Sequence, residues 1–157
     1  MENQQAHEPE SEPAYQAPTY TPCSDPPKSS GFGRVMSDAK DVFTSLKPWL
    51  GEQREHFVCF YLNVRHRMIG EPYILAIGSI CGVDVHPREV FREAIKVGAT
   101  AVIFAHNHPS GDTSPSRQDI ELTARLRQVG ELCGISVLDH VVFCASGFVS
   151  MADKGWI

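Results

Sequence analysis

Residues 101–119 have the sequence AVIFAHNHPSGDTSPSRQD, and the rest of the chain is organised around this stretch. Its first five residues are apolar and partly β-branched, which predicts a buried strand. The Pro- and Gly-containing loop at residues 109–115 cannot continue that strand, so the chain must turn sharply. Ser116, followed three residues later by Asp119, has the spacing of a capping box at a helix N-terminus. The stretch therefore predicts a strand, a tight loop and a helix whose start returns toward the end of the strand.

The same stretch carries a candidate metal site. Side chains two residues apart in a strand point to the same face, so His106 and His108 present two imidazoles side by side while Asn107 faces away. Asp119 in the first helical turn can add a carboxylate, and three such ligands leave a fourth tetrahedral position for water, which is typical of a catalytic zinc site. The alternative is that Ser116 and Asp119 only cap the helix. The two interpretations are compatible, because a cap also fixes the aspartate.

Hydrophobic periodicity and turn residues divide the rest of the chain into further elements. Three helices are predicted, at residues 37–46, 86–97 and 116–132. Five strands are predicted, the first two of them antiparallel, at residues 57–62, 68–76, 100–105, 136–143 and 147–150, the second with a Gly-Glu-Pro interruption at residues 70–72. The order αββαβαββ indicates a three-layer α/β domain around one mixed sheet.

The predicted helices have expected starts and expected buried faces. Ser37 is the expected N-cap of the first helix. His86 opens the second helix, with Pro87 at the first helical position. The second and third helices are each expected to bury a row of apolar side chains: Val90, Phe91, Ala94, Ile95 and Val97 in the second, and Ile120, Leu122, Leu126, Val129 and Leu132 in the third.

The first 33 residues differ in composition from the rest of the chain. They hold six of the eleven prolines and five acidic residues against one lysine, Lys28, with almost no aliphatic residues. Such a segment buries too little apolar surface to offset its conformational entropy, so residues 1–33 are expected to be a disordered, acidic, Pro-rich tail. Residues 34–157 are expected to form one domain. This domain is nearly neutral, because the tail carries four of the five net negative charges.

Composition also limits the partners and the compartment. A nearly neutral domain without a Lys/Arg block offers few phosphate contacts, so direct nucleic-acid binding is not expected. The five cysteines are scattered and include no C-x-x-C pair, so neither a disulfide framework nor a thiolate zinc knuckle is expected. No apolar segment approaches the roughly 20 residues of a membrane span, and the polar, acidic amino terminus does not resemble a signal peptide. A cytoplasmic protein is therefore expected.

Several motifs resemble those of a known family. The pattern H-x-H, seven residues, then S-x-x-D at residues 106–119 resembles the JAMM (MPN+) metalloprotease motif. The string HNHPSG at residues 106–111 is similar to the RadC branch of that superfamily. VHPREV at residues 85–90 and LDH at residues 138–140 also resemble RadC segments, so the similarity extends over roughly residues 37–151.

The resemblance implies a three-layer αβα domain of the cytidine-deaminase-like/JAB type around a mixed sheet. It implies one Zn2+ per chain, bound by His106, His108 and Asp119. It also implies that Ser116 stabilises the oxyanion of the tetrahedral intermediate. In that superfamily the general-acid/base glutamate lies at or just before an early strand, a position that Glu55 matches.

Some roles have alternatives. Glu52 and Glu71 compete with Glu55, but Glu52 lies farther into a polar turn and Glu71 lies in a hairpin interrupted by Pro72. His140 has two interpretations. It either orients a zinc ligand, since ligand histidines are held by outer hydrogen-bond partners, or is a buried strand histidine bonded to the backbone.

Two functional hypotheses follow from these motifs. The first is a zinc-dependent hydrolase that cuts peptide or isopeptide bonds in a protein or peptide substrate, with Glu55 as the general base. The second is a non-catalytic DNA-repair or mobile-element accessory or adaptor, because the RadC name is associated with DNA repair. No pattern in the sequence identifies the substrate.

Overall fold

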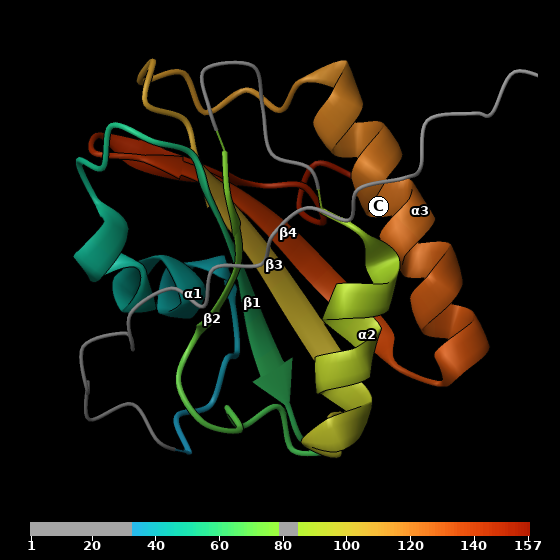
Figure 1. Ribbon diagram of the computed structural model, residues 1–157. Coiled ribbons are helices and arrows are strands. Elements are labelled where there is room, and N and C mark those ends of the chain that lie inside the picture. Colours follow the sequence, from blue (N-terminus) through green and yellow to red (C-terminus); the bar gives the residue numbers. More distant parts are fainter. Residues whose placement is uncertain (1–32, 79–84) are drawn as a thin grey trace, which may run out of the picture.

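The computed structural model describes residues 33–78 and 85–157 (Figure 1). The tail expected at residues 1–33 lies, except for Gly33, outside the described residues, so its disorder stays a prediction. Within the described residues, no helix is both long enough and apolar enough to cross a membrane.

The described residues confirm the predicted order αββαβαββ and add one short 3-10 helix. The helices are α1 (Ala39–Ser45), η1 (Lys47–Trp49), α2 (Pro87–Lys96) and α3 (Arg117–Cys133). The strands are β1 (His56–Leu62), β2 (Tyr73–Ile77), β3 (Ala101–Asn107), β4 (Ser136–Cys144) and β5 (Gly147–Ser150). They form one sheet in the order β2-β1-β3-β4-β5, in which β3 and β4 are parallel and the other neighbours are antiparallel. The sheet is therefore mixed, as predicted.

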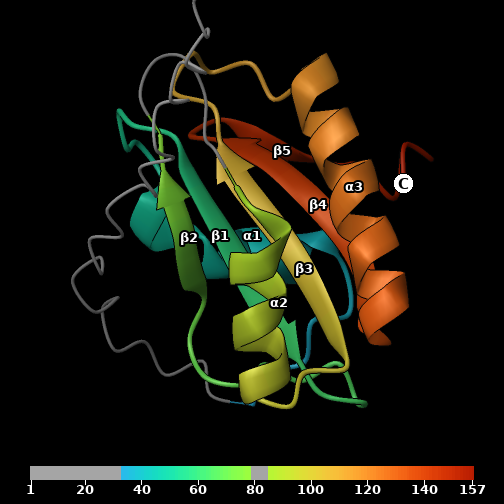
Figure 2. The ribbon, with the colours of Figure 1, turned by 45° about the vertical axis from the view of Figure 1, so that its right-hand side comes forward.

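Helices cover both faces of the sheet, which confirms the three-layer αβα prediction. Figures 1 and 2 show α1 on one side of the sheet and α2 and α3 on the other. On the first side Val42 of α1 belongs to the same core as Phe60, and on the second Phe91 and Leu126 share a core with Phe104. Because alternate side chains of β1 and β3 enter the two cores, both strands are buried along their whole length.

The central strand β3 brings the parts of the candidate site together. It pairs antiparallel with β1, where Phe57 lies opposite His106, and parallel with β4, where Val142 lies opposite the same histidine. Parallel neighbours need a crossover connection, and α3 supplies it between β3 and β4. The carboxyl end of β3, the amino end of β1 and the start of α3 therefore meet at one end of the sheet (Figure 1).

The predicted cap of the first helix is wrong by one residue. Asp38, not Ser37, is the N-cap of α1, and its carboxylate accepts a hydrogen bond from Asp41 N at 2.9 Å. Ser37 instead donates its backbone N–H to Asp41 Oδ2 at 3.0 Å. The two acidic side chains thus satisfy backbone donors at the start of the helix.

The second strand is shorter than predicted. Met68 forms only an isolated bridge with Leu62, and β2 begins at Tyr73. Gly70 adopts a positive φ of 75°, and Pro72 has no N–H to give to a ladder. These two residues interrupt the pairing between the bridge and the strand.

Two apolar residues expected in the core are exposed. Ile95 of α2 is 63% exposed and Leu132 of α3 is 88% exposed. Ile95 lies about 40° beyond the buried Phe91, at the edge of the buried face of α2, and Leu132 lies about 180° from the buried Thr123, on the opposite side of α3. Apolar character alone therefore predicted a wider buried face than either helix has.

Gly130 allows α3 to approach its neighbours, and its replacement tests this packing. A Cβ at this position would lie 2.5 Å from Ile135 O and 3.2 Å from Phe91 Cζ. We expect Gly130→Ala to destabilise the protein, because overpacking costs about 1–3 kcal/mol and the close contact is with rigid backbone. That cost exceeds the gain in helix propensity of about 1 kcal/mol from Gly to Ala. Urea unfolding measures the free-energy change.

Leu132→Ala in the same helix is the control for this measurement. Its side chain is 88% exposed, so we expect its free energy of unfolding to change by less than about 0.5 kcal/mol. Equal unfolding free energies for the two variants would contradict the close packing of α3.

Candidate metal centre

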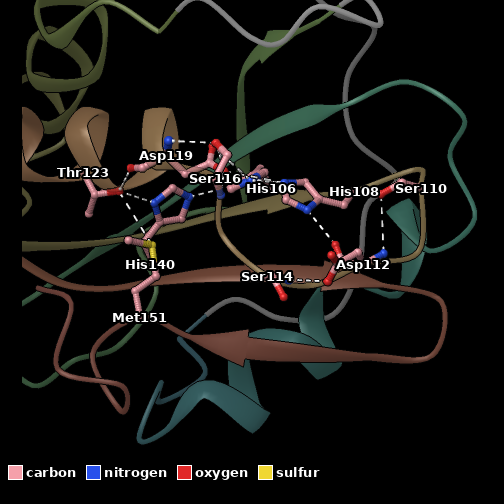
Figure 3. Close-up of polar contacts among 10 residues, drawn as sticks. All are labelled: His106, His108, Ser110, Asp112, Ser114, Ser116, Asp119, Thr123, His140 and Met151. Atoms are coloured by element: carbon pink, nitrogen blue, oxygen red, sulfur yellow. Dashed lines mark hydrogen bonds and ion pairs between the residues drawn. The ribbon is translucent and has the colours of Figure 1, made fainter.

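Two histidines meet at the carboxyl end of β3. His106 is the penultimate residue of the strand and is fully buried, whereas His108 follows the strand and is partly exposed. Their Nε2 atoms are 3.0 Å apart, so both imidazoles point to one place, as strand geometry predicts (Figure 3). His108 N donates to Phe143 O at 2.9 Å, which holds the chain beside β4 beyond the end of β3.

The loop after His108 returns the start of α3 to these histidines. Ser116 is the N-cap and Asp119 is N3, and Asp119 Oδ2 accepts from Ser116 N at 2.7 Å. This capping box confirms the predicted helix start. The capping box also orients the Asp119 carboxylate toward the imidazoles. Asp119 Oδ1 is 3.4 Å from His106 Nε2, and Oδ2 is 3.7 Å from His108 Nε2. The same aspartate thus closes the cap and completes the cluster.

The spacing of these three groups fits a metal ion. A tetrahedral ion with ligands at about 2.0–2.1 Å separates its ligand atoms by about 3.3 Å. The three separations here are 3.0, 3.4 and 3.7 Å. In the part of the chain that the structure describes, His106, His108 and Asp119 form a group whose ligand atoms all lie within 4.8 Å of one another. The group can therefore hold a metal through two nitrogens and a carboxylate oxygen.

The charges of the three groups are complementary. Burial opposes ionisation of Asp119, but the neighbouring imidazoles of His106 and His108 and the hydroxyl of Ser116 hold the pKa of its carboxyl far below the usual value. The neighbouring carboxylate of Asp119 raises the pKa of His108, while burial acts against this rise. Asp119 is therefore an ionised carboxylate near neutral pH, which is the form that binds a cation.

A backbone carbonyl orients the second histidine. His108 Nδ1 lies 2.6 Å from Asp112 O. A carbonyl oxygen only accepts hydrogen bonds, so Nδ1 of His108 donates and Nε2 keeps a free lone pair in the neutral ring. Asp112 is itself fixed in the loop, because its carboxylate accepts from Ser114 N at 2.9 Å (Figure 3). The loop thus presents His108 Nε2 to the site.

A third histidine, His140 of β4, lies behind the first. His140 Nε2 is 2.8 Å from His106 Nδ1, and His140 Nδ1 is 2.5 Å from Thr123 Oγ1 of α3 (Figure 3). The ring is fully buried and contacts the rings of Phe57 and Phe104. Burial lowers the pKa of His140 well below its usual value, so the imidazole is neutral. Both ring nitrogens bond to side chains, which is the geometry expected of the partner of a ligand histidine.

Glu55 immediately precedes β1, at the end of the sheet that carries the histidines. Phe57 pairs with His106, so Glu55 lies two residues from the paired position. Burial raises the pKa of the Glu55 carboxyl, the charge of His106 lowers it, that of Asp119 raises it and that of His108 lowers it. The Glu55 carboxylate is therefore within electrostatic range of all three groups.

Asn107, between the two histidines, faces away from them as predicted and holds the segment that carries Glu55. Its side chain is buried. Its Oδ1 accepts from His56 N at 2.7 Å, and its amide donates to Arg54 O at 2.9 Å and to Glu52 O at 3.2 Å. The backbone on both sides of Glu55 is therefore tied to β3.

The two competing glutamates are placed differently. The side chain of Glu52 is exposed in the turn before Glu55. Glu71 comes two residues before Tyr73, which pairs with Cys59 in the middle of β1. Because β2 runs antiparallel to β1, Glu71 lies toward the far end of β1, about 13 Å from the histidine end at the usual rise per residue. Of the three glutamates, Glu55 is the one whose carboxyl interacts electrostatically with His106, His108 and Asp119.

The hydroxyl of Ser116 is engaged within the capping box. Ser116 Oγ accepts from Asp119 N at 3.1 Å and lies 2.6 Å from Asp119 Oδ2. Because a carboxylate oxygen accepts, the hydroxyl proton is donated to it. The hydroxyl is therefore hydrogen-bonded to Asp119, one of the three candidate metal ligands.

Two residues of the centre, Asn107 and Thr123, are absent from the metal-site prediction. Thr123 follows Asp119 by four residues, the spacing at which a helical hydroxyl bonds the preceding turn, and its Oγ1 donates to Asp119 O at 2.6 Å. That spacing is visible in the sequence. The contact of Thr123 with His140 is not, because the packing of α3 against β4 creates it.

Comparisons with known proteins agree with the predicted resemblance. The model of the RadC-like JAB domain family matches residues 36–156. A UPF0758 protein of Bacillus licheniformis is 50% identical over 104 residues, which make up 66% of this chain and 46% of that protein. UPF0758 proteins of Bacillus cereus and Bacillus anthracis are each 51% identical over 105 residues, 67% of this chain and 46% of theirs. The matched part of the chain thus spans less than half the length of these relatives.

The region that the family model matches contains the five strands of the described residues and the three candidate metal ligands. The match covers most of the chain, and the relatives share about half of their aligned residues with it. The chain therefore belongs to the RadC-like JAB domain family.

Proposed function

We propose that this protein is a zinc-dependent hydrolase of peptide or isopeptide bonds, of the JAMM type. The observation that carries the proposal is the arrangement of His106, His108 and Asp119 at tetrahedral spacing. Three protein ligands leave one position for water, which distinguishes a catalytic zinc site from a structural one. The partly buried carboxylate of Glu55, which interacts with all three groups, supports the same function.

Each residue of the centre has a role in this reaction. His106, His108 and Asp119 hold the ion. Zinc, when bound, polarises the substrate carbonyl and lowers the pKa of a water to about 7. Glu55 acts as the general base toward the attacking water and as the general acid toward the nitrogen of the leaving amine.

The surroundings of Glu55 suit a group that both accepts and releases a proton. Burial raises the pKa of its carboxyl, which makes the protonated form accessible when the leaving amine needs a proton. The three hydrogen bonds of Asn107 fix the backbone on either side of it. A carboxylate held in this way approaches the reacting atoms without a loss of chain entropy at each turnover.

Ser116 supplies a hydrogen-bond donor to the carbonyl oxygen of the substrate as that oxygen gains negative charge. Its hydroxyl now donates to Asp119 Oδ2, 2.6 Å away. Rotation about one side-chain bond redirects the proton, while the backbone N–H of Ser116 keeps its own bond to Asp119. The helix cap therefore survives this change of partner.

A cytoplasmic location and a protein or peptide substrate complete the proposal. Cys59, Cys133 and Cys144 are free thiols, as is usual in a reducing compartment. A bond that joins two polypeptides and a bond within one polypeptide present the same amide to the zinc and to Glu55. The chemistry of the centre therefore covers both peptide and isopeptide bonds.

Removal of a ligand side chain tests the metal site. We expect the unmodified protein to keep close to one zinc per chain after dialysis, and His106→Ala and Asp119→Ala to lose it, because two ligands do not hold the ion in competition with water. Metal content is measured by plasma mass spectrometry. His86→Asn is the control: it changes a histidine that caps α2, retains a capping side chain, and should keep the zinc.

Substitution of the proposed base separates zinc binding from catalysis. We expect Glu55→Gln to keep the zinc and to slow hydrolysis at least about 100-fold, because it removes the general base. Hydrolysis is followed as new amines, by mass spectrometry, on a library of linear and isopeptide-linked peptides. Glu52→Gln, an exposed change in the same segment, should hydrolyse at the unmodified rate.

Unchanged hydrolysis by Glu55→Gln would refute the role of Glu55. A zinc-loaded protein that cleaves no library member, but retards duplex or branched DNA in a gel at low salt, would favour the adaptor hypothesis over the hydrolase.

A further inference from the structure

The two ligand histidines are oriented by different kinds of partner. His108 Nδ1 donates to the carbonyl of Asp112, which can only accept. His106 Nδ1 faces His140 Nε2 at 2.8 Å, and a nitrogen of a neutral imidazole either donates or accepts. The contact between these two rings therefore does not decide which nitrogen of His106 carries the proton.

The position of that proton matters for metal binding. A neutral imidazole binds a metal through the nitrogen that carries no proton. With the proton on Nδ1, His106 presents the Nε2 lone pair toward His108 and Asp119. With the proton on Nε2, an N–H bond occupies the direction in which the metal would lie.

The hydrogen bonds continue from His140 into α3 and end on a group that cannot donate. His140 Nδ1 is 2.5 Å from Thr123 Oγ1, and Thr123 Oγ1 is 2.6 Å from the main-chain oxygen of Asp119. Because that oxygen only accepts, Thr123 gives it the one proton of its hydroxyl. Thr123 Oγ1 then accepts a hydrogen bond from His140 Nδ1. His140 Nε2 carries no proton, so it accepts a hydrogen bond from His106 Nδ1.

The main-chain carbonyl of Asp119 sets this direction, because it only accepts. His106, His140 and Thr123 are fully buried, so each of their protons needs a partner within the protein. Reversal of these hydrogen bonds would take the hydroxyl proton from the Asp119 carbonyl and place the His106 proton on Nε2, which lies 3.0 Å from His108 Nε2. Met151 Sδ, 3.8 Å from Thr123 Oγ1, competes weakly, because thioether sulfur is a poor acceptor.

We propose that Thr123 and His140 are positioning residues that hold His106 in the tautomer with its proton on Nδ1, which leaves Nε2 ready to bind the metal. The proposal rests on the proposed metal site and extends it. The chain of bonds starts at the ring of His106 on β3 and ends on the main chain of Asp119 on α3. It therefore ties together two ligands that come from different elements.

Two substitutions of Thr123 test this chain of hydrogen bonds. Thr123→Val keeps the shape of the side chain and removes the hydroxyl, whereas Thr123→Ser keeps the hydroxyl. The tautomers of His106 and His140 are read from long-range 15N–1H correlations of the metal-free full chain at mildly alkaline pH, where imidazoles are neutral. Zinc affinity is measured by competition with a chromophoric chelator.

The expected result distinguishes the two variants. In the unmodified protein and in Thr123→Ser, both His106 and His140 carry the proton on Nδ1. In Thr123→Val the chain of hydrogen bonds no longer ends on the Asp119 carbonyl, so His106 becomes a mixture of tautomers. Zinc binding by Thr123→Val weakens about tenfold, the lower end of the effect seen when the outer partner of a ligand is lost.

Several results would overturn the proposal. One is a proton on Nε2 of His140 in the unmodified protein, a measurement that needs no variant to fold. Another is a folded Thr123→Val protein with an unchanged His106 tautomer, and a third is equal loss of affinity in both threonine variants, which would indicate packing. If the unmodified protein binds no zinc, the proposed function fails, but the tautomers of the metal-free protein still decide the role of Thr123 and His140.

Discussion

The register between β1 and β3 is the constraint on which the metal centre depends. Phe57 lies opposite His106 in this antiparallel ladder, so the amino end of β1 and the carboxyl end of β3 lie together. Because side chains of a strand alternate between its faces, a slip of one residue would carry His106 into the opposite core, away from α3. Both strands are buried on both faces, so the same slip would exchange the contents of both cores. Packing of the whole sheet therefore fixes the geometry of the site.

Around that register, each group of the centre is held by a bond to a different part of the fold. His108 is held by the carbonyl of Asp112 in the loop, His106 by His140 on β4, and Asp119 by the cap of its own helix. No buried side-chain nitrogen or oxygen within the described residues lacks a hydrogen-bond partner. Side chains held by such bonds need little reorganisation to bind an ion, which is what preorganisation of a site requires.

Local patterns predicted the elements well because they reflect local forces. The alternation of apolar residues follows the period of a strand or helix, and the Ser116 to Asp119 spacing follows the geometry of the first helical turn. The predictions were wrong where contacts with neighbouring elements determine burial or the start of a strand. Ile95 and Leu132 are apolar but lie outside the helix faces that pack against the sheet. The strand expected from Met68 begins only after the interruption by Gly70 and Pro72. How wide a helix face becomes buried depends on what packs against it.

The candidate ligands could be predicted from the sequence alone, because His106, His108 and Asp119 are related by the two-residue period of a strand and the first turn of a helix, both of which are local. Only the tertiary structure decided that Glu55 faces this set and that His140 lies behind it. Asn107 is 51 residues from His56, and His106 is 34 residues from His140. Contacts at such separations come from strand pairing, which the spacing of residues along one chain segment does not encode.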